Sequence, residues 1–291
     1  MVQKFFRTGI WIFTIQIIVS PVVSLGQTIY KGSLHNNRTN EIIPYASVGL
    51  MKENIGTNAD ENGNFELKSF MSFPDDTLII SCLGYQVLKI KVSGFDNSSL
   101  VMQLKEESIG LKEVVVSNIA RPKSDILNKF LKPSHEYTIS NTQLAQHFQI
   151  KRTNAKLVGI KICYSGYGPK YKNSIYRLRI YAMDSLTKAP SYDLYDKIIE
   201  VKAKGPMAFV NLKKYKIIIP DNDFFIAIEW LKVPTNLEKE LFKGEVSPSY
   251  LPIIGCTQRT EKTLEYWEFS YQNKWFLYEQ GTLLMQAIIK N

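Results

Sequence analysis

GTNADENGNFEL, residues 56–67, decides how the N-terminal part of the chain folds. Its alternating Asn and Asp residues have the spacing that opens a calcium loop, but the twelfth position of such a loop requires a bidentate Glu and is Ser69 here. Asp60 is the only carboxylate among the first three ligand positions, which leaves little charge to hold a cation. Asn62-Gly63 tolerates positive φ, and Asp60 can accept hydrogen bonds from turn amides. The stretch therefore predicts a tight β-hairpin that binds no calcium.

The segments on both sides of this turn alternate apolar and polar residues. The recurring apolar positions are Ala46, Val48, Leu50, Leu88, Ile90, Val92, Val114 and Val116. A period of two with one polar face is typical of strands that are wet on one side only. Roughly seven such runs, separated by turn residues, predict an antiparallel β-sandwich between Thr28 and Ser117.

Residues 28–117 also resemble a known family through five motifs that occur in order. The motifs lie in KGSLHNNRTNEIIPYASVGLMKENIGTNADENGNFEL, DTLIISCLGYQ and GLKEVVVS, with Ala59 where the family commonly has Thr. They are similar to those of the carboxypeptidase regulatory-like domain, a transthyretin-like (prealbumin-like) β-sandwich. The resemblance implies a seven-stranded sandwich that acts as a stabilising or docking module in exported or outer-membrane proteins of Gram-negative bacteria. It implies no peptidase activity.

Residues 1–26 have the layout of a secretory signal peptide. Basic residues precede an apolar run, Ile10–Val19, and small residues at positions 24 and 26 precede Gln27. A membrane anchor is the alternative, but the run is far shorter than the roughly 20 apolar residues that span a bilayer. We therefore expect cleavage before Gln27 and export to the periplasm or outer cell surface, with no transmembrane segment after cleavage.

Three cysteines bear on the redox chemistry of an exported chain. Cys82 lies in the apolar run TLIISCLGY and is expected in a core. Cys163 and Cys256 both fall in the C-terminal half and are the candidate pair for a disulfide, with two free thiols as the alternative.

Charge is divided unevenly along the chain. Residues 27–117 carry 8 Lys and Arg against 11 Asp and Glu, whereas residues 118–291 carry 26 against 16. A basic region is typical of a domain that meets an anionic partner, which for an exported protein means an acidic glycan, lipopolysaccharide or cell-surface protein rather than nucleic acid. A merely solvated surface is the simpler explanation.

The C-terminal part is expected to form a second, larger β-sandwich of jelly-roll type. Residues 118–137 are predicted to be a linker with a short helix in KSDILNKFLK, capped by Ser124. About ten β-rich runs follow over residues 138–291, interrupted by a predicted helix, Leu237–Lys243, with Asn236 as its cap. This half distantly resembles the β-sandwich that follows such regulatory-like domains in other bacterial exported proteins, a pairing that implies no particular activity.

The sequence offers little for catalysis, and we expect no enzyme activity, cofactor or metal. Its three histidines, His35, His135 and His147, lie in no zinc-binding pattern such as H-E-x-x-H. YSGYG around Ser165 is not the G-x-S-x-G of a nucleophile elbow. No glycine-rich phosphate loop is present.

Paired carboxylates are the remaining catalytic candidates. Asp193 with Asp196, and Glu265 with Glu268, have spacings from which glycosidase acids could be built. Solvation of the surface explains these pairs more simply.

An aromatic hairpin, EYWEFSYQNKWFLY at residues 265–278, points to a ligand site instead. An exposed row of its rings would stack on sugars, although packing of the large rings in a core is the stronger expectation. Arg177 and Arg179 share one face of the strand IYRLRIY and could bind an acidic sugar beside Tyr271 and Trp275.

Three functions compete. The leading one is a non-catalytic, exported docking module for a protein partner in the cell envelope. The alternatives are a carbohydrate-binding module for acidic glycans, at Trp275, Tyr271, Arg177 and Arg179, and an unrecognised hydrolase.

Overall fold

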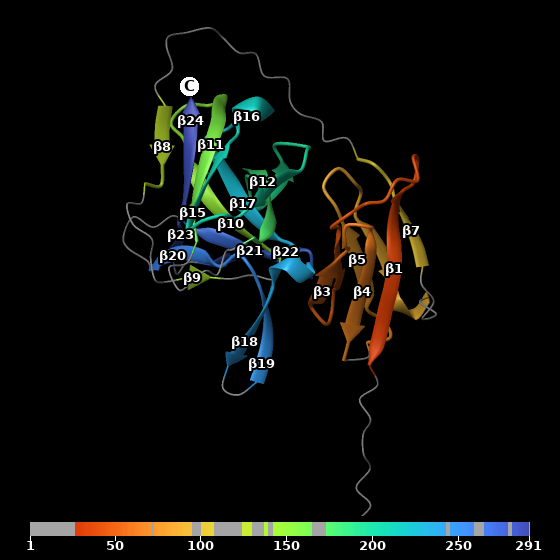
Figure 1. Cartoon of the computed structure of the whole chain (residues 1–291). Coiled ribbons are helices and arrows are strands. Elements are labelled where there is room, and N and C mark those ends of the chain that lie inside the picture. The colour runs from red at the N-terminus through yellow and green to blue at the C-terminus, as the bar shows by residue number, and fades with distance from the viewer. Residues whose placement is uncertain are drawn as a thin grey trace, which may run out of the picture.

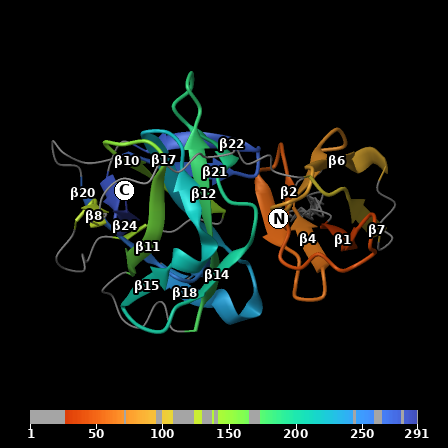
Figure 2. The same cartoon turned by 90° about the horizontal axis from the view of Figure 1, so that it is seen from above.

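The computed structural model describes residues 27–70, 73–94, 100–107, 124–129, 137–138, 142–164, 173–242, 245–258, 265–278 and 281–290. Within them the chain is all-β, as predicted, and its helical elements are single 3₁₀ turns at Val92–Gly94, Lys213–Tyr215 and Pro234–Asn236. Two β-sandwiches lie side by side (Figures 1 and 2). No helix in this part of the chain is long and apolar enough to cross a membrane. The predicted signal peptide, GLKEVVVS, His135 and Ser165 lie outside the described residues.

The N-terminal sandwich stacks a sheet in the order β4-β1-β7 on a sheet in the order β3-β2-β5-β6. The strands are β1 Thr28–Asn36, β2 Ser47–Leu50, β3 Ile55–Asn58, β4 Asn64–Ser69, β5 Thr77–Ser81, β6 Leu88–Lys91 and β7 Leu100–Leu104. Alternate apolar side chains from both sheets, such as Leu34 and Ile80, meet in one core. β1 and β7 run parallel, unlike the purely antiparallel sandwich expected. Their long connection through the other strands imposes no hairpin, so parallel pairing is possible.

Residues 56–67 form a tight turn organised by Asp60. Its Oδ1 accepts hydrogen bonds from the backbone N–H of Asn62 at 2.9 Å and of Asn64 at 2.8 Å. Gly63 has φ +75° and donates its N–H to the Asp60 carbonyl at 3.1 Å. The turn chemistry expected from Asp60 and Gly63 is therefore confirmed.

The predicted hairpin, however, is wrong, because β3 and β4 belong to different sheets. The turn carries the chain from one layer of the sandwich to the other. Ser69, at the position that a calcium loop reserves for Glu, is buried and donates its hydroxyl hydrogen to Glu53 at 2.5 Å. Local turn signals do not say which strand each neighbour will pair with, since that choice depends on distant strands.

The C-terminal sandwich stacks a seven-stranded sheet on a five-stranded one. The larger has the order β13-β12-β17-β10-β21-β22, with β14 also paired to β12, and the smaller has the order β15-β11-β24-β8, with β16 also paired to β11. The larger contains β10 Gln143–Gln149, β12 Ile175–Met183, β13 Pro190–Asp193, β14 Ile199–Lys202, β17 Asp223–Trp230, β21 Tyr266–Ser270 and β22 Lys274–Tyr278. The smaller contains β8 Ser124–Leu127, β11 Ala155–Cys163, β15 Met207–Asn211, β16 Ile217–Ile219 and β24 Met285–Lys290.

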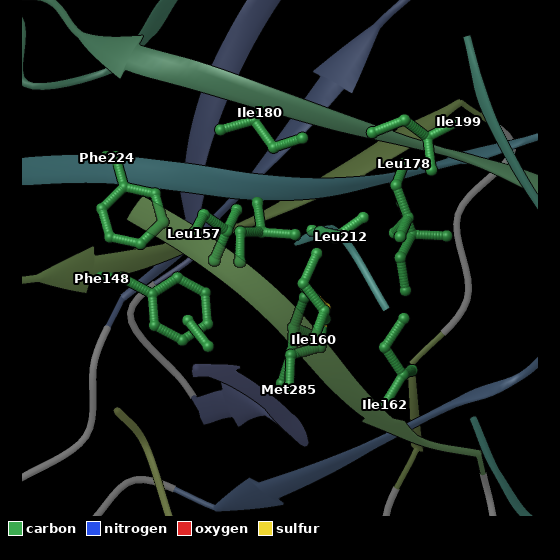
Figure 3. Close-up of a cluster of buried hydrophobic side chains, with 14 of the residues drawn as sticks. Phe148, Leu157, Ile160, Ile162, Leu178, Ile180, Ile199, Leu212, Phe224 and Met285 are labelled. Atoms are coloured by element: carbon green, nitrogen blue, oxygen red, sulfur yellow. The ribbon is translucent and has the colours of Figure 1, made fainter. Parts of the chain in front are cut away.

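One apolar core fills the space between these sheets (Figure 3). Phe148 and Phe224, on neighbouring strands of the larger sheet, stack with ring centroids 5.4 Å apart. They meet Leu157 and Ile160 of β11 from the smaller sheet. The prediction of a second, larger sandwich is confirmed, whereas its jelly-roll subtype and the domain boundaries stay predictions.

The helix predicted after residue 122 is wrong over Ser124–Leu127, which forms strand β8 at the edge of the smaller sheet. β8 pairs with β24, so that Leu127 packs against the core while Ile126 is exposed. Without β8, the edge of β24 would have unpaired backbone N–H and C=O groups. Pairing with this edge stabilises a strand more than the helical spacing of apolar residues stabilises a helix.

The helix predicted at Leu237–Lys243 is also wrong. Leu237–Phe242 forms β18, which pairs with β19, Glu245–Tyr250, in a ribbon that extends away from the sandwich (Figure 1). Asn236 does not act as a helix cap, because its side chain bonds both the N–H and the carbonyl of Ile175. A further small sheet joins β9 Tyr137–Thr138, β20 Ile254–Gln258 and β23 Gly281–Leu283.

Candidate functional site

The two sandwiches meet along a seam in which Arg177, Lys232 and Tyr271 contact residues 44–58 of the N-terminal sandwich. Tyr271 begins the turn between β21 and β22, and its ring lies on Gly49 of β2 and Gly56 of β3. These glycines sit opposite each other in the sheet. A Cβ added at Gly49 would stand 2.6 Å from Tyr271 Cδ1, so the ring fits only because both side chains are absent. Burial raises the pKa of Tyr271.

Lys232 makes the second contact of the seam. Its backbone N–H donates to Asn58 Oδ1 at 2.8 Å, and its Nζ donates to the Gly56 carbonyl at 2.7 Å. The Nζ also lies 4.9 Å from the centre of the Tyr271 ring and 5.7 Å from that of Tyr250. Burial lowers the pKa of this lysine to about 8, since the ammonium is held in a poorly solvated site.

Arg177 makes the third contact. Its side chain is 3% exposed, and its Nη atoms donate to the carbonyls of Pro44 and Tyr45 at 3.1 Å each. The guanidinium also lies 5.4 Å from the centre of the Tyr45 ring. Glu229, 4.0 Å away within the larger sheet, balances its charge. Because the planar guanidinium donates to two consecutive backbone carbonyls, it fixes the position of one sandwich against the other.

Beside the seam, the two sandwiches enclose a cleft of about 500 Å³. One wall is the segment after β5, from Ser81 to Tyr85, together with Glu107. The other wall is the outer face of the larger sheet, with Arg179, Asp193 and Trp275. Neither sandwich forms this cleft alone, and we call it the interdomain cleft.

The sheet wall of the interdomain cleft carries a connected polar network. Arg179 donates from Nε and Nη2 to the two carboxylate oxygens of Asp193, at 2.7 and 2.5 Å, and its Nη1 lies 3.5 Å from Glu229. Gln143 donates to Glu229 at 3.5 Å and accepts from the Tyr181 hydroxyl at 2.7 Å. Burial raises the pKa of Asp193 against the opposing effect of Arg179, and burial likewise raises that of Tyr181. The side chains of this wall are therefore held in place before any ligand binds.

Trp275 is the main aromatic residue of the cleft. It is half-buried, with its ring edge-on to Tyr181 at 5.5 Å and tilted against Phe269 at 5.0 Å. Tyr192, which precedes Asp193 on β13 and also lines the cleft, is 46% exposed. The cleft thus combines a fixed indole, a more exposed phenol and a polar wall.

The structure separates the four site residues expected from the sequence into two pairs. Arg179 and Trp275 line the interdomain cleft, whereas Arg177 and Tyr271 belong to the seam. Tyr271 and Trp275 do not form the exposed row of rings weighed as the alternative to core packing, because Tyr271 is covered by the N-terminal sandwich. Arg177 and Arg179 do share one face of β12, opposite Tyr176, Leu178 and Ile180 in the core, as predicted.

Sequence reasoning missed Lys232, Gln143 and Glu229. A signal existed for Glu229, since DFFIAIEWL places one carboxylate within a buried apolar run, where a partner is required. The role of Lys232 had no local signal, because its partners lie about 175 residues earlier in the chain.

Four of the other candidate residues, His35, His147, Asp193 and Glu268, have structural partners. His147 lies on β10 and bonds Asp223 at 2.9 Å, and the Nδ1 of His35 bonds the Asn40 carbonyl at 3.2 Å. Asp193 is engaged by Arg179, and Glu268 forms a hydrogen bond with Tyr278 that raises the pKa of that phenol. In the described ranges, no cluster of His, Cys, Asp and Glu has the arrangement of a metal site.

Cys82, Cys163 and Cys256 all lie in the described part of the chain. No disulfide joins Cys163 to Cys256 there. Cys82 packs against the core of the N-terminal sandwich, as predicted, and burial raises the pKa of its thiol.

Solved structures offer distant likenesses. The cysteine protease and lectin-like domains of Cwp84, a surface layer associated protein of Clostridium difficile, align at 9% identity and a TM-score of 0.36, covering 90% of this chain and 63% of that one. This chain therefore spans less than two thirds of that structure. A DUF3823 family protein from Bacteroides ovatus aligns at 12% identity and a TM-score of 0.20, covering 89% and 98% of the two chains. The major pilin subunit BcpA of Bacillus cereus aligns at 12% identity and 0.21, covering 89% and 69%. Likenesses this distant carry no information about function.

No curated protein matches the chain. A family model does match its N-terminal part, and the matched residues, 30–116, contain most of β1, all of β2 to β7 and the turn organised by Asp60. The resemblance seen in the sequence motifs is thereby confirmed, and residues 30–116 are a carboxypeptidase regulatory-like (CarboxypepD_reg-like) domain.

Proposed function

We propose that this protein is a non-catalytic binding protein of the cell envelope that holds its ligand in the interdomain cleft. The observation that carries the proposal is that both sandwiches supply walls of one cleft of about 500 Å³. Ligand sites of roughly 300 to 1,000 Å³, placed where two domains meet, are typical of proteins that bind small molecules or short chain segments. The basic-apolar-small layout of residues 1–26 supports export.

The seam supports a binding role for the regulatory-like domain. Arg177 and Lys232 bond backbone carbonyls of that domain, and Tyr271 packs on its glycine pair. These contacts set the distance between the two walls of the cleft. A preorganised cleft loses less conformational entropy when a ligand binds. In this proposal the regulatory-like domain completes the binding site rather than performing chemistry.

Capture of a ligand from envelope fractions tests the proposal. Immobilised protein of residues 27–291 should retain a component that a Ser191→Trp variant fails to retain, since Ser191 lines the cleft and the new ring would obstruct it. Ser185→Trp is the matched control, because Ser185 is exposed in the turn between β12 and β13, away from the cleft. Equal retention by Ser191→Trp and the unmodified protein would contradict the proposal.

Docking of an envelope protein is a second candidate function, supported by the outer face of the smaller sheet. Phe209 of β15 is 64% exposed, and its ring lies next to Gly159 and Ile288 of the neighbouring strands. Ile126 of β8, opposite Ile288, is also exposed and completes an apolar stripe across four strands. Lys156 and Lys161 flank the stripe on β11.

Such an apolar stripe with basic neighbours fits a protein partner whose contact surface is apolar with an acidic rim. A photoreactive residue in place of Phe209 should cross-link this partner in cells. A photoreactive residue in place of Asn211, on the same strand, should also give an adduct, and adding Phe209→Lys should abolish it. An unchanged adduct after Phe209→Lys would contradict this second function.

A further inference from the structure

We infer that the ligand of the interdomain cleft is a neutral, hydroxyl-rich sugar chain rather than the acidic glycan expected from the basic charge of the C-terminal half. This inference rests on the proposed function and names the ligand class of the same cleft. It follows from how the charges at the cleft are already paired.

The arginines of the site are not available to an anion. Arg179 directs its Nε and Nη2 hydrogens to Asp193 and approaches Glu229 with Nη1, while Arg177 donates to the N-terminal sandwich. Asp193 and Glu229 balance the two guanidinium charges, and Glu107, on the opposite wall, adds one negative charge. An anionic ligand would therefore meet repulsive carboxylates, and among the described residues that line the cleft no cation is left unpaired to bind it.

Hydroxyl groups suit this polar wall. Each carboxylate oxygen of Asp193 accepts one hydrogen bond from Arg179 and has a second acceptor site for a sugar hydroxyl. The Arg179–Asp193 pair offers these acceptors in a fixed geometry, because Glu229 also contacts the Arg179 guanidinium and is itself bonded by Gln143. An apolar ligand would bury these carboxylate sites unsatisfied, at a cost in affinity.

The aromatic residues provide the apolar part of sugar recognition. The C–H face of a pyranose packs well on a flat ring, and an indole provides the largest such surface among side chains. Trp275 is held by Tyr181 and Phe269, so little rotamer entropy is lost when a sugar stacks on it. Tyr192 is exposed at the cleft and offers a second ring to the next sugar unit.

Calorimetric titration of residues 27–291 with neutral and acidic oligosaccharide panels tests the inference. Neutral chains should bind, with an affinity that does not change between low and high salt, since no net charge is neutralised. Trp275→Ala should weaken binding about tenfold or more, corresponding to about 1.4 kcal/mol. Trp275→Phe should retain most of the affinity. Phe276→Ala is the matched control, because Phe276 is the next residue of β22, is exposed and does not line the cleft.

The outcomes separate this inference from the proposed function. Salt-sensitive binding of acidic chains that needs Trp275 would overturn the neutral class while supporting the cleft. If no sugar binds but Ser191→Trp still blocks capture of a ligand, the sugar is the wrong ligand class and the proposed binding site in the cleft is retained. Sugar binding that ignores Trp275→Ala and Ser191→Trp alike would overturn both.

Discussion

The ring of Tyr271 occupies the space that a side chain at Gly56 would need. The two residues lie in different sandwiches, and Gly49, opposite Gly56, forms the other half of the same flat patch. The absence of side chains on two adjacent strands lets a ring lie against bare backbone. The seam thus depends on shape as well as on hydrogen bonds.

We expect Gly49→Val to separate the two sandwiches without unfolding either. Valine favours strands, so β2 should persist, while its Cβ would clash with Tyr271. Small-angle scattering should show a larger radius of gyration, and thermal melting should split into two transitions. Gly94→Val is the control, because a Cβ at Gly94 would meet nothing within 4 Å. An unchanged radius of gyration in Gly49→Val would contradict this account of the seam.

The free energy of unfolding should increase as pH rises through the pKa of Lys232, because the buried side chain then loses its charge. Its pKa is about 8 when buried and 10.5 at its ordinary value, so the buried state bears the full cost of the charge below pH 8. Between pH 8 and 10.5 the exposed lysine binds more protons than the buried one, so stability increases with pH, by up to about 3 kcal/mol.

Denaturant titration across this pH window, compared with Lys232→Met, isolates the effect of Lys232, because tyrosine ionisation is common to both proteins. The free energy of unfolding of the unmodified protein should rise relative to that of the variant. Parallel pH profiles for the two proteins would show that the lysine is not buried as described.

Arg177→Met should destabilise the chain by about 3 kcal/mol or more, because it leaves the buried Glu229 without one of its two arginines and two backbone carbonyls without donors. Urea unfolding measures the loss. Adding Glu229→Gln should recover part of it, since the uncompensated charge is then removed. A double variant less stable than the sum of both single changes would argue against charge pairing as the cause.

Asp60→Ala should lower the stability of the N-terminal sandwich by about 1 to 2 kcal/mol, because two turn amides lose a charged acceptor. Glu61→Ala, at the exposed neighbouring position, is the control and should change little. Differential scanning calorimetry measures both variants. Adding calcium should not shift the melting temperature, and a calcium-induced rise that disappears in Asp60→Ala would restore the calcium-loop reading.

Local chemistry made parts of the fold predictable. Alternation of apolar residues identified strands such as β2 and the outward face of β12, and Asp60 with Gly63 identified a turn. These features depend on residues within a few positions of one another. The same reasoning failed at Ser124–Leu127 and Leu237–Phe242, where helical spacing of apolar residues gave way to pairing with a distant or following strand.

The sequence by itself determined the all-β class, the regulatory-like domain and the shared strand face of Arg177 and Arg179. Those properties follow from short-range periodicity and from motifs that can be read directly. Only the tertiary structure decided that Arg177 and Tyr271 join the two sandwiches while Arg179 and Trp275 face a cleft. Residues that alternate identically along a strand acquire different roles according to what packs on them. That packing is set by contacts between segments more than 100 residues apart, which no local pattern encodes.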